Sequence, residues 1–290
     1  MSKVTVIVPV HNAEPYLRTA LDALAAQTLQ AWTAVCVDDG STDGSAEILD
    51  DYAARDPRLA VVRQANAGAS AARNAGLARA TGEIVAFLDA DDVPGPDWLA
   101  RLHAGIEGVD LVWGGGIVNE NGIEKIEVPH DVGASYDDGA VRQRVWTAVF
   151  GYRLGDLVGL VLPGGLWKRC RRELGGLYWR AFRRDVIGNL RFDTRLRLYE
   201  DAMFLAAYAR RAKSMRVIGN TGYRYFIRET GSMLTETREQ LVANKFALRD
   251  ARKELDPEMT QWRGTYVLSA LQVLKATRSL REMLRYLRFR

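Results

Sequence analysis

Hydrophobic residues in the first 115 positions follow two alternating spacings. Five short apolar, mostly β-branched runs predict buried strands, at residues 4–8, 32–37, 59–63, 83–88 and 110–113. Between these runs, apolar or small side chains recur every three or four residues. This spacing predicts helices around residues 17–24, 48–52, 70–80 and 97–105. Repeated strand–helix units of this length predict an α/β fold, with a mostly parallel sheet and helices on both faces.

The pattern loosens after Gly116, which follows the last of these strands. Residues 119–139 are typical of a loop or an irregular hairpin. Residues 141–162 suggest a helix interrupted by glycines. Three further helices are expected, at residues 199–211, 240–255 and 261–286.

Composition is that of a globular protein long enough to bury a full core. The 290 residues are 48% hydrophobic and 26% charged, and the net charge of +4 indicates an anionic partner without identifying it. Cys36 and Cys170 form neither a disulfide framework nor a zinc-binding spacing, and Cys36 should be a buried thiol. No apolar stretch reaches the roughly 20 residues that cross a bilayer. We therefore expect a cytoplasmic protein.

Acidic or polar loops follow three of the predicted strands. They are residues 9–12, 38–39 and 89–92. Because the carboxyl ends of parallel strands share one edge, five carboxylates are expected to face a single cleft, those of Asp38, Asp39, Asp89, Asp91 and Asp92. Such a cluster needs a neutralising cation, and Mg²⁺ or Mn²⁺ suits carboxylate oxygens. The alternative for residues 38–43 is a turn with a helix cap, whereas a turn at 89–92 would need only one aspartate.

Two other charged positions stand out. Arg73 shares a helical stripe with Leu77 and Ala80, which directs it toward the sheet, where it needs a carboxylate or a phosphate. The alternative is a shifted helix with a solvated arginine. Glu200 and Asp201 open the predicted helix at 199–211; they are candidates for acid–base chemistry, or simply acidic residues favoured by the helix dipole.

Four segments resemble family 2 glycosyltransferases with the GT-A fold. They are VIVPVHN at 6–12, VDDGSTD at 37–43, GASAARNAG at 68–76 and FLDADD at 87–92. The resemblance is close over residues 3–115 and looser beyond, where YEDAMF at 199–204 resembles the "ED" helix start and WRAFRR at 179–184 a tryptophan-led basic segment. It implies a nucleotide-sugar-binding half at 1–115, an acceptor-binding and catalytic half at 116–235, and a C-terminal helical extension at 236–290.

The resemblance also implies roles for single residues. Asp39 would contact the base of a uridine diphosphate, and the backbone of Pro9, Val10 and His11 would line the nucleoside. The wider nucleotide-binding set includes Asn12, Asp38, Arg73, Asp89 and Ala90. Asp89 and Asp91 would form the Asp-x-Asp motif that binds Mn²⁺ or Mg²⁺, chiefly through Asp91. Asp201, beside Glu200, would be the catalytic base.

The implied reaction moves a sugar, with inversion, from a nucleotide diphosphate sugar to a glycan or lipid-linked acceptor. Trp179, Arg228 and Ser232 are candidates for contacts with the acceptor or the diphosphate. Two positions depart from the family pattern: His11 stands where an aromatic residue is frequent, and Arg228 replaces a frequent late histidine.

Other functions are excluded by the sequence or remain as alternatives. The dinucleotide and P-loop glycine motifs are absent, which argues against a nicotinamide dehydrogenase or a P-loop enzyme. A sugar-nucleotide pyrophosphorylase-like nucleotidyltransferase and a non-catalytic nucleotide- or anion-binding module remain as alternatives. No nucleic acid partner is expected. The basic, amphipathic residues 275–290 could rest on an anionic membrane at its inner face, or pack against the protein.

Overall fold

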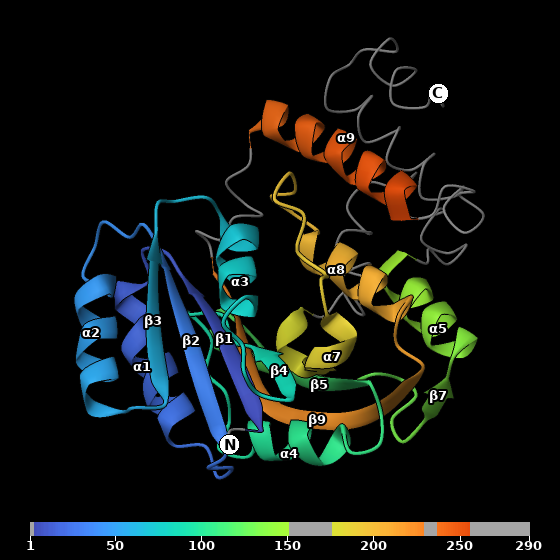
Figure 1. Cartoon of the computed structure of the whole chain (residues 1–290), viewed down its shortest axis with the longest axis horizontal. Coiled ribbons are helices and arrows are strands. Elements are labelled where there is room, and N and C mark those ends of the chain that lie inside the picture. Colours follow the sequence, from blue (N-terminus) through green and yellow to red (C-terminus); the bar gives the residue numbers. More distant parts are fainter. Residues whose placement is uncertain (1–2, 151–175, 229–236, 256–290) are drawn as a thin grey trace.

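The fold is a single mixed sheet covered by helices on both faces (Figure 1). The structure is a computed structural model, and it describes residues 3–150, 176–228 and 237–255. In this part of the chain the strand order is β3-β2-β1-β4-β8-β5-β9-β7, with β6 paired to β5. The strands are β1 (Val4–Val10), β2 (Trp32–Asp39), β3 (Leu59–Gln64), β4 (Ile84–Phe87), β5 (Leu111–Glu120), β6 (Ile123–Glu127), β7 (Ser135–Asp137), β8 (Arg180–Arg183) and β9 (Ser214–Ile227).

Pairing divides the sheet into two regions. The pairs β3–β2, β2–β1 and β1–β4 are parallel, as the strand–helix repeat predicts. Beyond β4, β8 runs antiparallel to both of its neighbours, while β5 and β9 are again parallel. The described helices are α1 (Glu14–Ala25), α2 (Ser45–Arg55), α3 (Ala69–Leu77), α4 (Trp98–Gly105), α5 (Gly139–Phe150), α7 (Arg184–Ile187), α8 (Glu200–Ala209), α9 (Arg238–Leu255) and a 3-10 turn, η1 (Leu177–Trp179).

Strand alternation builds two hydrophobic cores. Val4, Val6 and Val8 of β1 pack with α1, α2 and α4 on one face, whereas Ile7 joins Phe87 and the helices α5 and α8 on the other. Successive side chains of a strand point to opposite faces, so a strand in the middle of this sheet must be apolar at nearly every position. This explains the continuous apolar runs in the first half of the sequence.

Most predicted elements of the first half are confirmed, and the errors lie in the second. The strand predicted to end before the glycines at 114–116 continues through them to Glu120. Strands β8 and β9 were not predicted. In β9, glycines and arginines interrupt the alternation of apolar and polar residues that marks a strand. The irregular hairpin is confirmed as the β5–β6 pair. Cys36 is buried, and burial raises the pKa of its thiol to about 12.

The predicted helix at 141–162 is confirmed up to residue 150, and that at 240–255 is α9. The remainder of the first of these helices, the helix predicted at 261–286 and Cys170 lie outside the described residues. Among the helices that the structure describes, none combines the length and apolar character needed to cross a membrane.

The glycine at 116 lets β5 run past the Trp179 indole. A Cβ at this position would overlap the Trp179 ring nitrogen and lie 2.7 Å from the Tyr223 carbonyl oxygen. Gly116→Ala should therefore lower the free energy of unfolding by about 1–3 kcal/mol, as overpacking does. Gly139→Ala is the matched control, because its Cβ would meet open space at the start of α5. Urea denaturation of both variants checks this, and equal stability of the two would contradict it.

Candidate functional site

The loops that follow β1, β2 and β4 lie at one edge of the sheet. Val10 at the end of β1 pairs with Asp38 near the end of β2, and β4 ends at Phe87 opposite Ile7. The far end of β9 reaches the same region, because Val93 bridges Arg224. The polar loops predicted from the sequence are therefore neighbours, joined there by β9, which the sequence did not predict.

Asp38 and Asp39 are buried and held by hydrogen bonds. Asp38 Oδ1 accepts a bond from the Ser41 amide at 3.0 Å, which closes the turn after β2. The Asp39 carboxylate accepts bonds from the Gln64 side chain and from the amides of Ala67 and Gly68, at 2.8 to 2.9 Å. Asp38 thus closes the turn after β2, whereas Asp39 shapes the entrance to α3. The turn is confirmed for this segment, but the helix cap is not, because α2 is capped by Gly44 without a side-chain hydrogen bond.

The His11 ring lies over this turn. Its Nδ1 is 2.9 Å from the Asp39 carbonyl oxygen, which can only accept, so Nδ1 carries the proton. Its Nε2 then accepts a bond from the Asn66 side chain at 3.0 Å. Asn12 has a φ of 50° and accepts a bond from the Thr42 amide at 2.8 Å. An imidazole with a fixed tautomer therefore lies exposed at the mouth of the site.

The three aspartates after β4 have different environments. Asp92 is fully buried and accepts bonds from the Tyr223 hydroxyl and the Phe226 amide, both at 2.9 Å. Burial, and then the charges of Asp89 and Asp91, raise the pKa of Asp92 well above its ordinary value. The expectation that five carboxylates face one cleft is therefore wrong for Asp92, which ties the loop to β9.

Asp89 and Asp91 keep part of their carboxylates exposed, 27% and 42% of each side chain. Burial and the charge of Asp89 raise the pKa of Asp91, so negative charge is in excess here. Arg228 lies beside them, with Nη2 donating to the Asp91 carbonyl at 2.6 Å and Nε 3.6 Å from its carboxylate. Its guanidinium stacks over Tyr16, 3.8 Å from the ring centre.

Arg73 connects this loop to α8. Its Nη2 donates to Asp89 Oδ1 at 3.1 Å and its Nη1 to Glu200 Oε1 at 2.9 Å, with 10% of the side chain exposed. Although burial opposes the charge, Asp89 and Glu200 raise the pKa of Arg73 above its usual value. The predicted direction of Arg73 is confirmed, and its anions in this structure are carboxylates.

Glu200 and Asp201 form the first turn of α8. Burial, and then the proximity of Asp201, raise the pKa of Glu200 to about 7. Burial also raises the pKa of Asp201, whose Oδ1 accepts a bond from the Ala202 amide at 2.6 Å. Glu200 faces Asp89 across the Arg73 guanidinium, and Asp201 is close enough for the charges of Arg73 and Asp89 to affect its pKa. The helix start is thus part of the same site as the Asp-x-Asp loop.

The tryptophan-led segment is interior. Trp179 is 5% exposed and Arg180 is 1% exposed, with the Arg180 guanidinium 3.9 Å from the ring centre of Trp113. Burial lowers the pKa of Arg180 to about 9. Trp179 ends η1 and Arg180 begins β8, so the start of this segment is buried in the fold. Ser232 lies outside the described residues.

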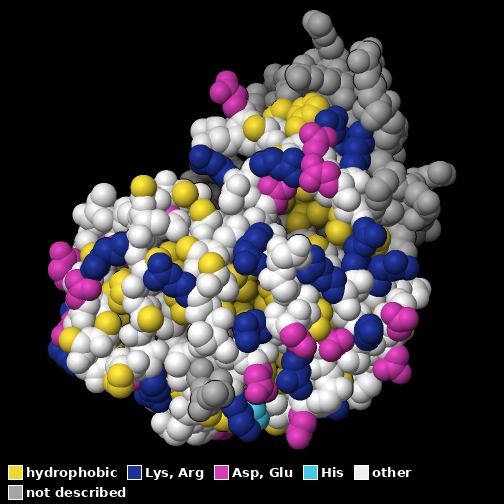
Figure 2. Space-filling view, in the orientation of Figure 1, with side chains coloured by type: hydrophobic (Ala, Val, Ile, Leu, Met, Phe, Trp, Pro, Cys, Tyr) yellow, Lys and Arg dark blue, Asp and Glu magenta, His cyan; other side chains and the backbone are white. Residues whose placement is uncertain are grey.

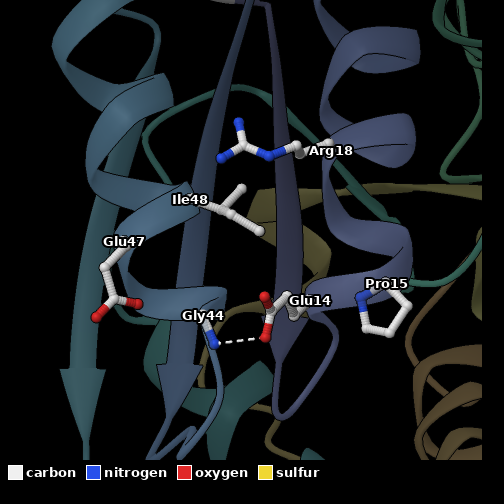
Figure 3. Close-up of a pocket in the computed structure, with 6 residues that line it drawn as sticks. All are labelled: Glu14, Pro15, Arg18, Gly44, Glu47 and Ile48. Atoms are coloured by element: carbon white, nitrogen blue, oxygen red, sulfur yellow. Dashed lines mark hydrogen bonds between the residues drawn. The ribbon is translucent and has the colours of Figure 1, made fainter.

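A groove of about 510 Å³ separates α1 from α2 (Figure 3). It is lined by Glu14, Pro15, Arg18, Gly44, Glu47 and Ile48. The Glu14 carboxylate accepts a bond from the Gly44 amide at 2.8 Å and so joins the starts of the two helices. The groove shares no residue with the carboxylate edge, and its charges are mixed.

Two residues of the site were missed by sequence reasoning. Tyr223 of β9 donates to Asp92 and accepts from the Asp89 amide at 3.2 Å. Asn74 brackets the Phe192 backbone, accepting from its amide at 2.8 Å and donating to its carbonyl at 2.9 Å. Asn74 directly follows Arg73, and an asparagine on the inward side of a helix was the available signal.

Comparison with protein families identifies the chain. The model described as "Glycosyl transferase family 2" matches residues 5–158. The chain belongs to glycosyl transferase family 2. The match contains the loops after β1, β2 and β4, together with Arg73.

Individual relatives agree with this family 2 assignment. The uncharacterized glycosyltransferase EpsJ of Bacillus subtilis (strain 168) is 32% identical over 237 residues, which are 80% of this chain. The chain spans 63% of the length of EpsJ. S. aureus TarS 1–349 in complex with UDP-GlcNAc superposes with a TM-score of 0.64 at 22% identity, covering 96% of this chain and 73% of TarS 1–349.

A second solved structure has the same fold. Mannosyltransferase PcManGT from Pyrobaculum calidifontis, in complex with GDP-Man and Mn²⁺, gives a TM-score of 0.58 at 20% identity and covers 98% of this chain and 74% of that one. The family 2 chain thus has the GT-A fold expected from its sequence.

The raised pKa of Glu200 makes stability depend on pH. A carboxyl whose pKa rises from 4.5 to about 7 on folding binds its proton more tightly in the folded state, so its contribution is lost as pH rises through about 7. Relative to Glu200→Gln, the wild type should lose unfolding free energy between pH 5 and pH 7. Urea titrations at several pH values check this. A constant difference between the two proteins over that range would contradict it, and Glu254→Gln is the exposed-site control.

Proposed function

We propose that this chain transfers a sugar from a nucleotide diphosphate sugar to an acceptor hydroxyl, with inversion at the anomeric carbon. The observation that carries this proposal is the pairing of two acidic groups across Arg73. On one side is the Asp89–Asp91 loop, suited to a cation and a diphosphate, and on the other is the Glu200–Asp201 helix start, suited to accepting a proton. A metal-assisted displacement needs both at one site.

The donor's nucleoside would bind over the turn after β2. Pro9, Val10, His11 and Asn12 form one wall and Asp38 and Asp39 the other. Asp39 already accepts three hydrogen bonds, and a carboxylate has about four acceptor positions, so one is left for an imide N–H of uracil. The UDP-GlcNAc complex of TarS supports a uridine donor, and His11, with its fixed tautomer, would contribute a polar edge in place of an aromatic face.

A divalent cation, Mn²⁺ or Mg²⁺, fits the donor set at Asp89 and Asp91. Their carboxylates are adjacent and partly exposed, and the pKa of Asp91 is raised by burial and by Asp89, as expected where positive charge is lacking. In the described part of the chain no group of three acidic, His or Cys side chains could hold a metal ion, so Asp89 and Asp91 would supply only part of the coordination shell. The bound ion would neutralise charge on the diphosphate, and the Mn²⁺ complex of PcManGT supports this use.

Asp201 would remove the proton from the acceptor hydroxyl. Its raised pKa makes it a stronger base than an exposed aspartate, and its bond from the Ala202 amide fixes its orientation. Glu200, which lies in the same turn of α8 as Asp201, would hold Arg73 in place. Arg73 and Arg228, the cations nearest the Asp-x-Asp loop, would stabilise the departing diphosphate, with Ala90 between the two carboxylates.

The acceptor would be a glycan or a lipid-linked sugar. Figure 2 shows Lys and Arg side chains, interspersed with Asp and Glu side chains, over the half of the molecule that carries α5, α7 and α8, and the Lys and Arg side chains would bind anionic groups of the acceptor. Trp179 lies buried behind this site and would support its wall without stacking on the sugar. Ser232 and the basic residues 275–290, with their proposed contact with an anionic membrane at its cytoplasmic face, remain predictions outside the described residues.

Two other functions use the same geometry differently. A nucleotidyltransferase would join a nucleoside triphosphate to a sugar phosphate and release pyrophosphate, whereas the proposed transferase releases a nucleoside diphosphate. A non-catalytic module would bind nucleotide without turnover. Incubation with a panel of nucleotide sugars and Mn²⁺, followed by measurement of free nucleoside diphosphate, distinguishes the proposed transferase from the other two.

Donor binding should depend on the cation. UDP should stabilise the protein only with Mn²⁺ or Mg²⁺ present, because the carboxylates of Asp89 and Asp91 otherwise repel the diphosphate. At about a hundredfold excess over the dissociation constant the gain is roughly 2.7 kcal/mol, which is visible in a melting curve. Asp91→Ala should abolish most of that gain. Equal stabilisation by UDP in EDTA would contradict the role of the cation.

The base should be separable from the donor site. Asp201→Asn should keep the shape of the site and its affinity for UDP with Mn²⁺, while the transfer rate falls by at least the roughly 10²- to 10⁴-fold credited to a positioned base. Asp91→Ala, in contrast, should lose binding and transfer together. A selective loss in Glu200→Gln, with near wild-type transfer in Asp201→Asn, would move the role of base to Glu200.

A further inference from the structure

The turn of backbone that leads into α8 has an unusual conformation. Tyr199 has a φ of 68° and a ψ of 12°, in the left-handed region, directly before Glu200 and Asp201. An aromatic residue there carries steric strain of about 1–3 kcal/mol, so surrounding contacts must hold it. Tyr199 is the residue at which the chain turns into α8, and Asp201 lies in the first turn of that helix.

Helix α9 supplies the contacts that hold this turn. Asn244 is 4% exposed, and its Oδ1 accepts bonds from the amides of Arg197 and Leu198 at 3.1 and 3.2 Å. Its Nδ2 lies 3.4 Å from the Leu198 carbonyl, and the next residue, Lys245, places Nζ 5.1 Å from the centre of the Tyr199 ring. The Asn244 side-chain amide therefore forms hydrogen bonds with both N–H groups and with one carbonyl group in the two residues before Tyr199.

The rest of α9 anchors this amide. Leu248 and Ala251 are buried in the same hydrophobic core as the side chains of α8, on the same helical face as Asn244. Figure 1 shows α9 lying along the outer side of α8. At the other end of the segment, Asn74 brackets the Phe192 backbone. The segment from 192 to 199 is thus fixed to α3 at its start and to α9 at its end.

We propose that Asn244 is a positioning residue that holds the backbone before Tyr199 in its left-handed entry to α8 and thereby orients Asp201 toward the acceptor. The proposal rests on the proposed function for the identity of the base. Without the amide, two part-buried N–H groups lose their acceptor, and Tyr199 can relax to a negative φ, which rotates the start of α8. A misplacement of about 1 Å at a catalytic group costs on the order of 10²-fold in rate.

The first measurement is kinetic. Asn244→Leu should lower kcat for transfer by at least about tenfold, with the stabilisation by UDP and Mn²⁺ unchanged, because the donor residues belong to other elements. Asn244→Asp keeps an acceptor oxygen for both amides and should recover most of the rate. Glu254→Gln is the matched control, since it removes the exposed ion pair between Arg195 and the same helix and should change kcat less than about twofold. Wild-type kcat in Asn244→Leu would overturn the proposal.

A double-mutant cycle tests the strain directly. Glycine adopts a positive φ without cost, so in a Tyr199→Gly background the Asn244→Leu change should cost only a few-fold in kcat, against at least about tenfold in the wild-type background. A merely structural role for Asn244 would give equal losses in both backgrounds. Equal losses would therefore overturn the proposal.

Hydrogen exchange separates this proposal from the proposed function. In Asn244→Leu the amides of Arg197 and Leu198 should exchange at least about tenfold faster than in the wild type, while those of α1 and α2 keep their wild-type rates. Unchanged exchange of the Arg197 and Leu198 amides would overturn the positioning role of Asn244, whatever reaction the chain catalyses. Failure of the wild-type chain to release nucleoside diphosphate from any donor would refute the proposed function. The exchange result would still report on the positioning role of Asn244.

Discussion

The buried guanidinium of Arg73 is the interaction on which the site is built. An arginine that is 10% exposed must be paired, and this one uses a carboxylate from each half of the chain, Asp89 after β4 and Glu200 at the start of α8. Removing either partner would leave charge buried without compensation. The ion pairs therefore fix α3, the aspartate loop and α8 relative to one another.

Negative charge exceeds positive charge around this arginine. Asp91 and Asp92, like Glu200 and Asp201, have raised pKa values, in each case first because of burial. Arg73 and Arg228 reach only some of these groups, and Asp92 is held by hydrogen bonds from Tyr223 and Phe226. In the proposed reaction this imbalance has a use, because it favours binding of the divalent cation that the donor diphosphate requires.

Two asparagine side chains position the backbone through uncharged hydrogen bonds. Asn74 and Asn244 satisfy main-chain groups at the two ends of the segment before α8. Such bonds fix geometry without adding charge to a region already rich in carboxylates. The strained φ of Tyr199 is maintained by this surrounding framework, since its local sequence gives no preference for it.

The sequence by itself determined the parallel half of the sheet and the places where chemistry begins. Apolar runs such as 4–8 and 32–37 must be buried on both faces, and the polar loops that follow them must meet at one edge, whatever the rest of the chain does. The direction of Arg73 was predictable for the same reason, because helical spacing fixes it relative to Leu77.

Tertiary structure decided what local patterns do not encode. Strand β9 is recognisable only through its partners, since glycines and arginines interrupt its alternation, and Asp92 became structural only because Tyr223 and Phe226 of β9 reach it. The joining of residue 73 to residue 200, and of residue 244 to residues 197 and 198, depends on contacts between segments far apart in the chain. Periodicity reports which face of an element is buried, but the particular partner on that face is fixed only when the elements pack.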